Sequence, residues 1–117
     1  MVAETLKKKS GVGDGGRVAL TVRAVGAVSD AIVASLPGDL LGLRGPYGTA
    51  WPIEEATERD ALVVAGGLGL APLRTAIDAL ADGGPTRLTV VIGAREPEQV
   101  LFSDELWRWR SLGADVH

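Results

Sequence analysis

The chain has 117 residues, a hydrophobic content of 46%, a charged content of 23% and a formal net charge of -3. These values suit a soluble globular protein with one ordinary domain or two pieces of a larger one, and they give no reason to expect nucleic acid as a partner. The sequence contains no cysteine, which excludes disulfides, thiolate metal sites and a cysteine nucleophile within it.

The first part of the chain is predicted to form a strand and a short helix. Residues 1–16 combine a lysine run with closely spaced glycines, which favours a flexible lead-in. Alternating apolar side chains over residues 17–25 predict a half-buried strand. Gly26 ends that strand, and Ser29 is expected to cap a helix. The apolar side chains at helical spacing predict its buried face, formed by Ile32, Val33 and Leu36.

The segment after this helix is predicted to contain a second strand and a linker. A turn is expected at residues 37–39, a short strand over residues 40–44 and another turn at residues 45–48. Residues 49–59 have no clear period and are interpreted as a linker between two packing units. Within this linker, Trp51 is either an interface residue or a packed core residue.

The stretch ALVVAGGLGLAPLR, residues 61–74, predicts a strand, a tight glycine turn and a helix. A glycine turn after a buried strand lets backbone amides approach a phosphate, and the helix directs the positive end of its dipole to the same place. Pro72 suits the first helical turn, although it stands where a dinucleotide fingerprint has its third small residue. A tight turn that binds no ligand is the alternative interpretation.

The remaining segment predicts an α/β pattern. Leu70, Leu73, Ile77 and Leu80 mark the buried face of the helix, which residues 82–85 end. Residues 87–92 form a nearly continuous apolar strand, as expected when both faces of a parallel sheet are covered. A second helix is expected to bury Phe102, Leu106 and Trp109, and a third strand begins at Ala114. Strand–helix–strand–helix–strand is half of a doubly wound nucleotide-binding fold.

Two loops are predicted to meet at the ligand-binding edge of this sheet. They are residues 66–72 and residues 93–97, which follow the carboxyl ends of two strands. Arg95 is a permanent cation that suits phosphate or carboxylate, and the alternative is a surface arginine paired with Glu96 or Glu98. The capped helix at Val28 and Ser29 is a second potential anion site, although a capped helix without a ligand is the more common case.

Three segments resemble the ferredoxin–NADP reductase superfamily: RGPYG, VVAGGLGLAPLR and GAREPEQVLFSDELWRW, which begin at residues 44, 63 and 93. The similarity is closest to the flavoprotein (gamma, or diaphorase-like) subunits of cytoplasmic hydrogenases and anaerobic sulfite reductases and to the electron-transfer subunit of dihydroorotate dehydrogenase. The resemblance implies a partial antiparallel flavin-binding barrel followed by half of a doubly wound parallel nucleotide-binding sheet. Residues 17–50 would be the C-terminal part of the barrel, residues 51–60 a linker and residues 61–117 the N-terminal part of the NAD(P)-binding domain.

The resemblance also implies the cofactors FAD and NAD(P) and the residues that bind them. The FAD pyrophosphate would lie at Gly26, Val28 and Ser29, and the turn that closes the barrel would contain Gly45 and Pro46. The NAD(P) pyrophosphate would lie at the glycine turn and the start of the next helix, at Gly66, Gly67, Gly69, Leu70 and Pro72. Two residues of the next loop, Gly93 and Arg95, would lie beside the bound dinucleotide. No protein acid or base is required, since hydride transfer from NAD(P)H to flavin N5 is the chemistry of the cofactors. We predict neither catalytic residues nor metal ligands.

Electrons would pass to an iron–sulfur partner such as a hydrogenase-type subunit, with any iron–sulfur cluster on missing segments or on that partner. The family's upstream flavin motif, most barrel strands and the segment that distinguishes NAD from NADP are not in the sequence. We therefore expect an internal piece of a longer reductase. The alternatives are a non-catalytic NAD(P)-binding module and an inactive remnant. A P-loop NTPase is disfavoured because no Gly-Lys-Ser/Thr follows the turn.

The sequence gives no sign of a membrane protein. No apolar run approaches the roughly 20 residues that a membrane helix requires. The first residues also lack the hydrophobic region of a secretion signal. We therefore expect a cytoplasmic protein without a membrane span.

Overall fold

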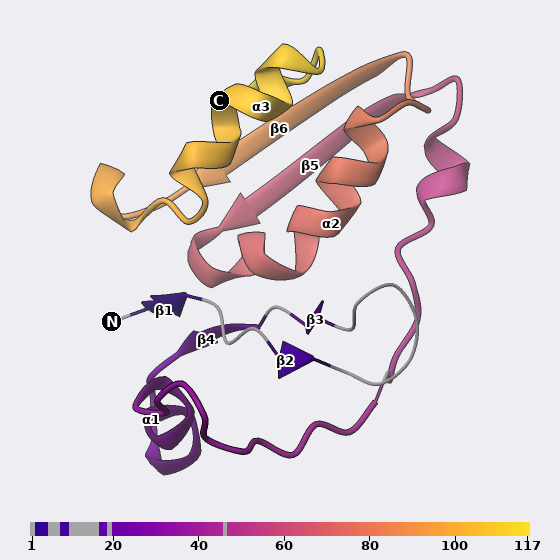
Figure 1. The fold of residues 1–117 in the computed structure, drawn as a ribbon. Coiled ribbons are helices and arrows are strands. Elements are labelled where there is room, and N and C mark those ends of the chain that lie inside the picture. The colour runs from indigo at the N-terminus through magenta and orange to yellow at the C-terminus, as the bar shows by residue number, and fades with distance from the viewer. Residues whose placement is uncertain (1, 5–7, 10–16, 19, 46) are drawn as a thin grey trace. The chain divides into compact units, whose positions relative to one another are not determined.

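The computed structural model describes residues 2–4, 8–9, 17–18, 20–45 and 47–117. The chain divides into two compact units, residues 1–47 and residues 48–117, which we call the first unit and the second unit. Figure 1 shows the elements of both. Within the described residues, no helix has the length and apolar character needed to cross a membrane.

The described residues of the first unit form two small antiparallel sheets and one short helix. Strand β1 (Val2–Glu4) pairs with β4 (Thr21–Arg23), and β2 (Lys8–Lys9) pairs with β3 (Arg17–Val18). The strand predicted over residues 17–25 is therefore found as two shorter strands, and β1 and β2 arise from the predicted lead-in. The rest of the lead-in, like Pro46, lies outside the described residues.

Helix α1 (Ala27–Val33) differs from its prediction in its start and its burial. It begins after Gly26, so Ser29 lies inside its first turn instead of capping it. None of its residues is buried, and Leu36, which was predicted to be buried, is 69% exposed. The turn predicted at residues 37–39 is present, since the Asp39 amide donates to the Leu36 carbonyl at 3.0 Å.

The strand predicted over residues 40–44 is wrong, because this segment has no regular secondary structure. A strand requires a neighbour for its hydrogen-bond ladder. None of the strands in the described parts of the chain pairs with residues 40–44.

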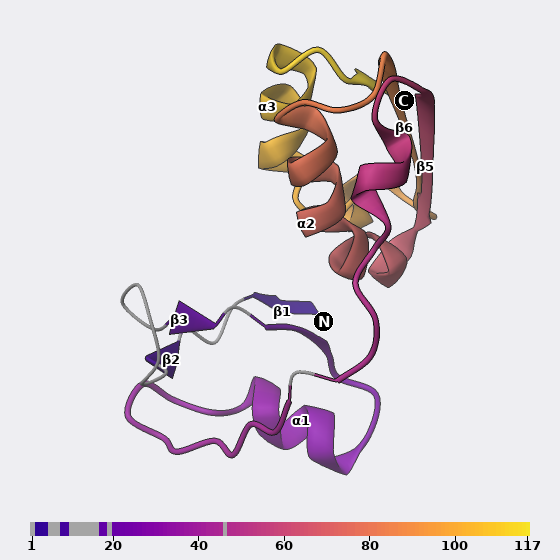
Figure 2. The ribbon, with the colours of Figure 1, turned by 90° about the vertical axis from the view of Figure 1, so that its right-hand side faces the viewer.

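The second unit contains a parallel sheet in the order β5-β6-β7. Its strands are β5 (Asp60–Gly66), β6 (Arg87–Gly93) and β7 (Asp115–Val116), and its helices are α2 (Leu70–Ala81) and α3 (Leu106–Ser111). Each strand is added beside the previous one, so right-handed crossovers place both helices on one face of the sheet, as Figure 2 shows. The predicted strand–helix–strand–helix–strand order is confirmed.

The core of the second unit lies between the sheet and these two helices. The sheet contributes Val63, Ala65, Leu88 and Val90, and the helices contribute Leu70, Ile77, Leu80 and Trp109. The predicted buried face of α2 is thus confirmed, with Leu73 packed more loosely against the core. The helix ends at Ala81 with Asp82 as its C-cap, and the following Gly83 has the left-handed φ of 132° that glycine adopts without strain.

The opposite face of the sheet is exposed, contrary to the prediction that both faces are covered. Leu62 and Val64 are 66% and 64% exposed, and their register partners on β6 are Thr89 and Val91. The apolar run of residues 87–92 does not indicate which face of the sheet is covered. The covered face is decided by the two helices, which both lie on one side of the sheet.

Short 3-10 turns complete the second unit: η1 (Ile53–Ala56), η2 (Gly67–Gly69), η3 (Pro97–Gln99) and η4 (Ser103–Glu105). Ile53 and Ala56 of η1, in the segment interpreted as a linker, pack against the core. Trp51 is 52% exposed, and its indole N–H donates to the Pro72 carbonyl at 3.1 Å. Phe102 is buried as predicted, but it precedes η4 instead of lying on α3.

Candidate functional site

The predicted glycine turn lies at the carboxyl edge of the parallel sheet. Strand β5 ends at Gly66, which is in register with Gly93 at the end of β6. The turn η2 follows, and α2 begins immediately after it. Ala65 before the turn and Leu70 after it are buried. The turn is therefore fixed at both ends while Gly66 and Gly69 remain exposed.

Only one glycine of this turn is required by the backbone. Gly67 has a φ of 50°, in the left-handed region that favours glycine. Gly66 is extended (φ -124°, ψ 126°) and Gly69 is helical (φ -61°, ψ -16°), conformations that any residue adopts. A Cβ added to Gly66 or Gly69 would meet no heavy atom within 4 Å. The alternative of a tight turn without a ligand therefore explains Gly67 but leaves the other two glycines unexplained.

The turn η2, which leads directly into α2, presents backbone amides without a competing side chain. No side chain caps either element, and the first turn of α2 contains no acidic residue. The amides at the start of α2 donate to the Gly67 and Leu68 carbonyls, so the amides of η2 are the ones at the open start of this helical segment, where the helix dipole gives a partial positive charge. The contact of Trp51 with the Pro72 carbonyl holds this first turn from the side. The arrangement suits an anion at the open side of the turn.

The loop after β6 brings an unpaired cation to the same edge. Arg95 is exposed, and its side chain makes no ion pair or hydrogen bond with any of the described residues. The predicted alternative, a pair with Glu96 or Glu98, is not found. The Glu96 carboxylate instead accepts a hydrogen bond from Gln99 Nε2 at 3.1 Å. Gly93, which begins this loop, adds no side chain beside Gly66.

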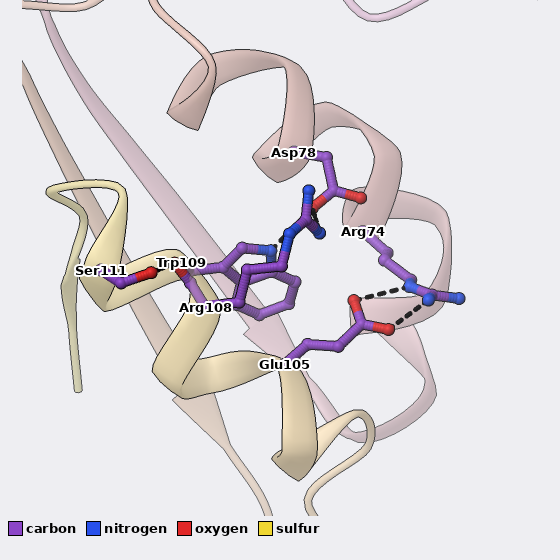
Figure 3. A network of polar contacts seen from close by, with 6 residues as sticks. All are labelled: Arg74, Asp78, Glu105, Arg108, Trp109 and Ser111. Carbon is purple, nitrogen blue, oxygen red and sulfur yellow. Dashed lines mark hydrogen bonds and ion pairs between the residues drawn. The ribbon is translucent and has the colours of Figure 1, made fainter.

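A polar network that the sequence did not reveal joins α2 to the segment before and within α3 (Figure 3). The Arg74 guanidinium makes two hydrogen bonds to the Glu105 carboxylate, one of them from Nε to Oε2 at 2.9 Å. Asp78 Oδ1 accepts from Arg108 Nη1 at 2.9 Å and from Trp109 Nε1 at 2.8 Å. The hydrogen bond to Glu105 raises the pKa of Arg74 above its usual value, so the guanidinium stays charged.

One signal in the sequence points to this network. Arg74 and Asp78 are four residues apart on one helix, and Glu105 and Arg108 are three apart on the other segment. Each pair therefore lies on one face, with opposite charges that complement the other pair.

The residues predicted to bind FAD belong to the first unit. Gly26 precedes α1, whose first turn contains Val28, which is exposed, and Ser29. Ser29 Oγ donates to the Gly26 carbonyl at 3.0 Å and accepts from the Val25 amide at 2.9 Å, so its one proton is already used within the unit. Gly45 is exposed, and Pro46 lies outside the described residues.

Comparison with known proteins shows what the second unit is similar to. Residues 63–115 match the family model of the oxidoreductase NAD-binding domain. This segment runs from within β5, through the glycine turn and the Arg95 loop, to β7. The two loops that meet at the edge of the sheet thus both lie within the matched domain.

The relatives confirm the predicted resemblance to the ferredoxin–NADP reductase superfamily. The chain is 34% identical over 90 residues to the Sulfhydrogenase 2 subunit gamma of Pyrococcus furiosus. The match covers 76% of this chain and 31% of the relative. It is 38% identical over 89 residues to a probable dihydroorotate dehydrogenase B (NAD(+)) electron transfer subunit of Methanothermobacter thermautotrophicus. The match covers 76% of this chain and 32% of the relative.

A solved structure supports the same assignment. The structure of an NADH-dependent reduced ferredoxin–NADP oxidoreductase matches with a TM-score of 0.71 at 28% identity, over 88% of this chain and 37% of the other. The chain thus spans about a third of the length of the proteins that it matches. At a general level, its relatives are oxidoreductases and electron-transfer subunits.

Proposed function

We propose that the glycine turn between β5 and α2 binds the pyrophosphate of NAD(P)H, and that the chain takes part in electron transfer between NAD(P)H and FAD. The observation that carries this proposal is the open space at Gly66 and Gly69, where neither backbone conformation nor packing requires glycine. That space lies beside the uncapped N-terminus of α2. A diphosphate is the ligand that such a cradle of amides suits.

The residues of this edge would share the work of binding and orientation. The turn at Gly66, Gly67 and Gly69, with the first residues of α2, Leu70 and Pro72, would surround the pyrophosphate. Gly93 would leave room for the dinucleotide, and the Arg95 guanidinium would pair with one of its charged groups. The bound dinucleotide supplies the hydride, and the protein supplies position and electrostatics.

The flavin part of the proposal is supported by the resemblance. We propose that FAD lies at Gly26, Val28, Ser29, Gly45 and Pro46, with residues 17–50 as part of a flavin barrel and residues 61–117 as part of the NAD(P) domain. Because the Ser29 proton is donated to Gly26, the backbone amides at the start of α1 would be the donors to the FAD phosphate. Electrons would continue to an iron–sulfur or hydrogenase-type subunit in the cytoplasm.

The test is the Gly69→Ala variant of the full chain, with NADH and NADPH titrated by calorimetry. A methyl group at residue 69 fills the space beside the amides, so we expect the dissociation constant to rise about tenfold, or ~1.4 kcal/mol. The helical φ of residue 69 accepts alanine, so the melting temperature should not fall. Gly42→Ala, which also places a methyl group in open space, is the matched control and should leave binding unchanged.

The same titrations separate the competing functions. If Gly69→Ala binds NAD(P)H as well as the unmodified chain, the turn is not the binding site. If the unmodified chain binds neither NADH, NADPH nor FAD, it is an inactive remnant. Binding of NAD(P)H without FAD, together with no reductase activity after the missing segments are added, would instead favour a non-catalytic NAD(P)-binding module.

A further inference from the structure

The loop that carries Arg95 has few anchors outside itself. Residues 94–105 connect β6 to α3, and their backbone hydrogen bonds are local, such as Gln99 N to the Glu96 carbonyl and Glu105 N to the Phe102 carbonyl. Among the side-chain hydrogen bonds and ion pairs of this fully described segment, only the pair between Glu105 and Arg74 reaches another element. Phe102 is its buried apolar anchor, beside the partly buried Leu101 that packs against the same core.

Arg74 contacts both of these anchors. Its guanidinium makes two hydrogen bonds to Glu105 and lies over the Phe102 ring, 4.6 Å from the centroid. Phe102 is in the left-handed region (φ 53°, ψ 37°), which is strained for a bulky side chain and persists only where the surroundings hold it. Arg74 supplies part of those surroundings.

Arg74 also belongs to the helix that begins at the glycine turn. It lies four residues after Leu70, the first residue of α2, so it is one helical turn from the proposed pyrophosphate site. The same side chain therefore connects the helix that carries one ligand loop to the segment that carries the other. Figure 3 shows the guanidinium reaching from α2 to Glu105.

We propose that Arg74 is a positioning residue that fixes the Arg95 loop relative to the glycine turn through Glu105 and Phe102. The proposal rests on the proposed binding of NAD(P)H at that turn. A lysine cannot replace Arg74 fully, because a point charge lacks the planar fork that bonds Glu105 twice and lies flat on an aromatic ring. Arg74 would thus raise dinucleotide affinity without contacting the dinucleotide.

The ion pair between α2 and α3 provides a matched control. Arg108 of α3 pairs with Asp78, one turn further along α2 from the glycine turn, and the side-chain contacts described for Arg108 do not reach residues 94–105. The Arg74 and Arg108 side chains are similarly exposed, at 36% and 43%. Loss of either arginine removes one ion pair of α2, but only the Arg74 pair reaches the segment of residues 94–105.

The experiment compares Arg74→Gln and Arg108→Gln in the full chain. We expect similar losses in melting temperature, but faster hydrogen–deuterium exchange of residues 94–102 only in Arg74→Gln. The NADH dissociation constant of Arg74→Gln should rise about tenfold. The dissociation constant of Arg74→Lys should lie between that of Arg74→Gln and that of the unmodified chain. Arg108→Gln should change the NADH dissociation constant less than twofold, about 0.4 kcal/mol by the logarithmic relation between affinity and free energy.

Exchange in the free chain requires no dinucleotide, so the two proposals can fail separately. If the unmodified chain binds no NADH, the proposed function fails while the exchange still tests the positioning role. If residues 94–102 exchange alike in both variants, the positioning role is overturned even where NADH binds. Glu105→Gln removes the same pair from the other side and tests the loop should Arg74→Gln fail to fold.

Discussion

The two units of the chain differ in how their apolar side chains are covered. In the second unit, twelve apolar residues between Val63 and Val116 are buried and form a core between sheet and helices. In the first unit, none of the side chains of residues 20–45 and 47 is buried. Both units contain a helix with an apolar face, yet only the helices of the second unit bury side chains against a sheet. Periodicity therefore indicates which face is apolar, and the topology decides whether that face is covered.

The largest expected effect contrasts Trp109 with Val28. Trp109 is fully buried on α3, whereas Val28 on α1 is 76% exposed. Trp109→Ala should lower the free energy of unfolding by about 3–5 kcal/mol, because it removes packing and leaves a cavity. Val28→Ala should change it by less than about 0.5 kcal/mol. Denaturant unfolding measures both, and a large loss for Val28→Ala would mean that α1 is covered in solution.

A smaller contrast concerns two carboxylates that accept hydrogen bonds. Asp78 accepts from the buried Trp109 indole, and Asp39 in the first unit accepts from the exposed Leu36 amide at 2.8 Å. Asp78→Ala should cost about 1–3 kcal/mol, since a buried N–H then has no acceptor. Asp39→Ala should cost at most about 0.5 kcal/mol because water replaces the lost acceptor.

The control for this prediction is Asp78→Asn, which keeps an oxygen for the indole and loses the charge that pairs with Arg108. We expect its unfolding free energy to lie between that of the unmodified chain and that of Asp78→Ala. Equal losses for Asp78→Asn and Asp78→Ala would show that the ion pair, and not the indole hydrogen bond, carries the effect.

The fold of the second unit could be predicted because its signals are local. Strand lengths, the helical spacing of Leu70, Ile77 and Leu80, and the glycines that end the helices all act over a few residues. The placement of the glycine turn and the Arg95 loop at one edge follows from parallel strands alone. The roles of individual site residues stay predictions, since they depend on ligands.

What the sequence could not provide depends on contacts between distant residues. The strand predicted over residues 40–44 lacks a partner, and strand pairing is decided by the rest of the chain. The bonds of Arg74 and Asp78 join residues about 30 positions apart. Ser29 was predicted to cap α1, but its hydroxyl bonds backward to Val25 and Gly26, as a short polar side chain in a first turn can do.

A last contrast tests the two faces of the sheet itself. Leu62 on β5 is 66% exposed, while Leu88 on β6 is 5% exposed and faces the helices. Leu88→Thr should lower the unfolding free energy by about 2 kcal/mol or more, because it loses packing and buries a hydroxyl. Leu62→Thr should change it by less than about 0.5 kcal/mol, since threonine suits an exposed strand position.

The control for this last contrast is protein concentration. An exposed apolar sheet face favours association, so Leu62→Thr should also reduce light scattering of the concentrated chain. If Leu62→Thr instead costs as much as Leu88→Thr, and the loss grows with protein concentration, a second copy covers this face. This face of β5 and β6 would then be exposed only in the separated chain. The prediction of a sheet buried on both faces would hold for the assembly.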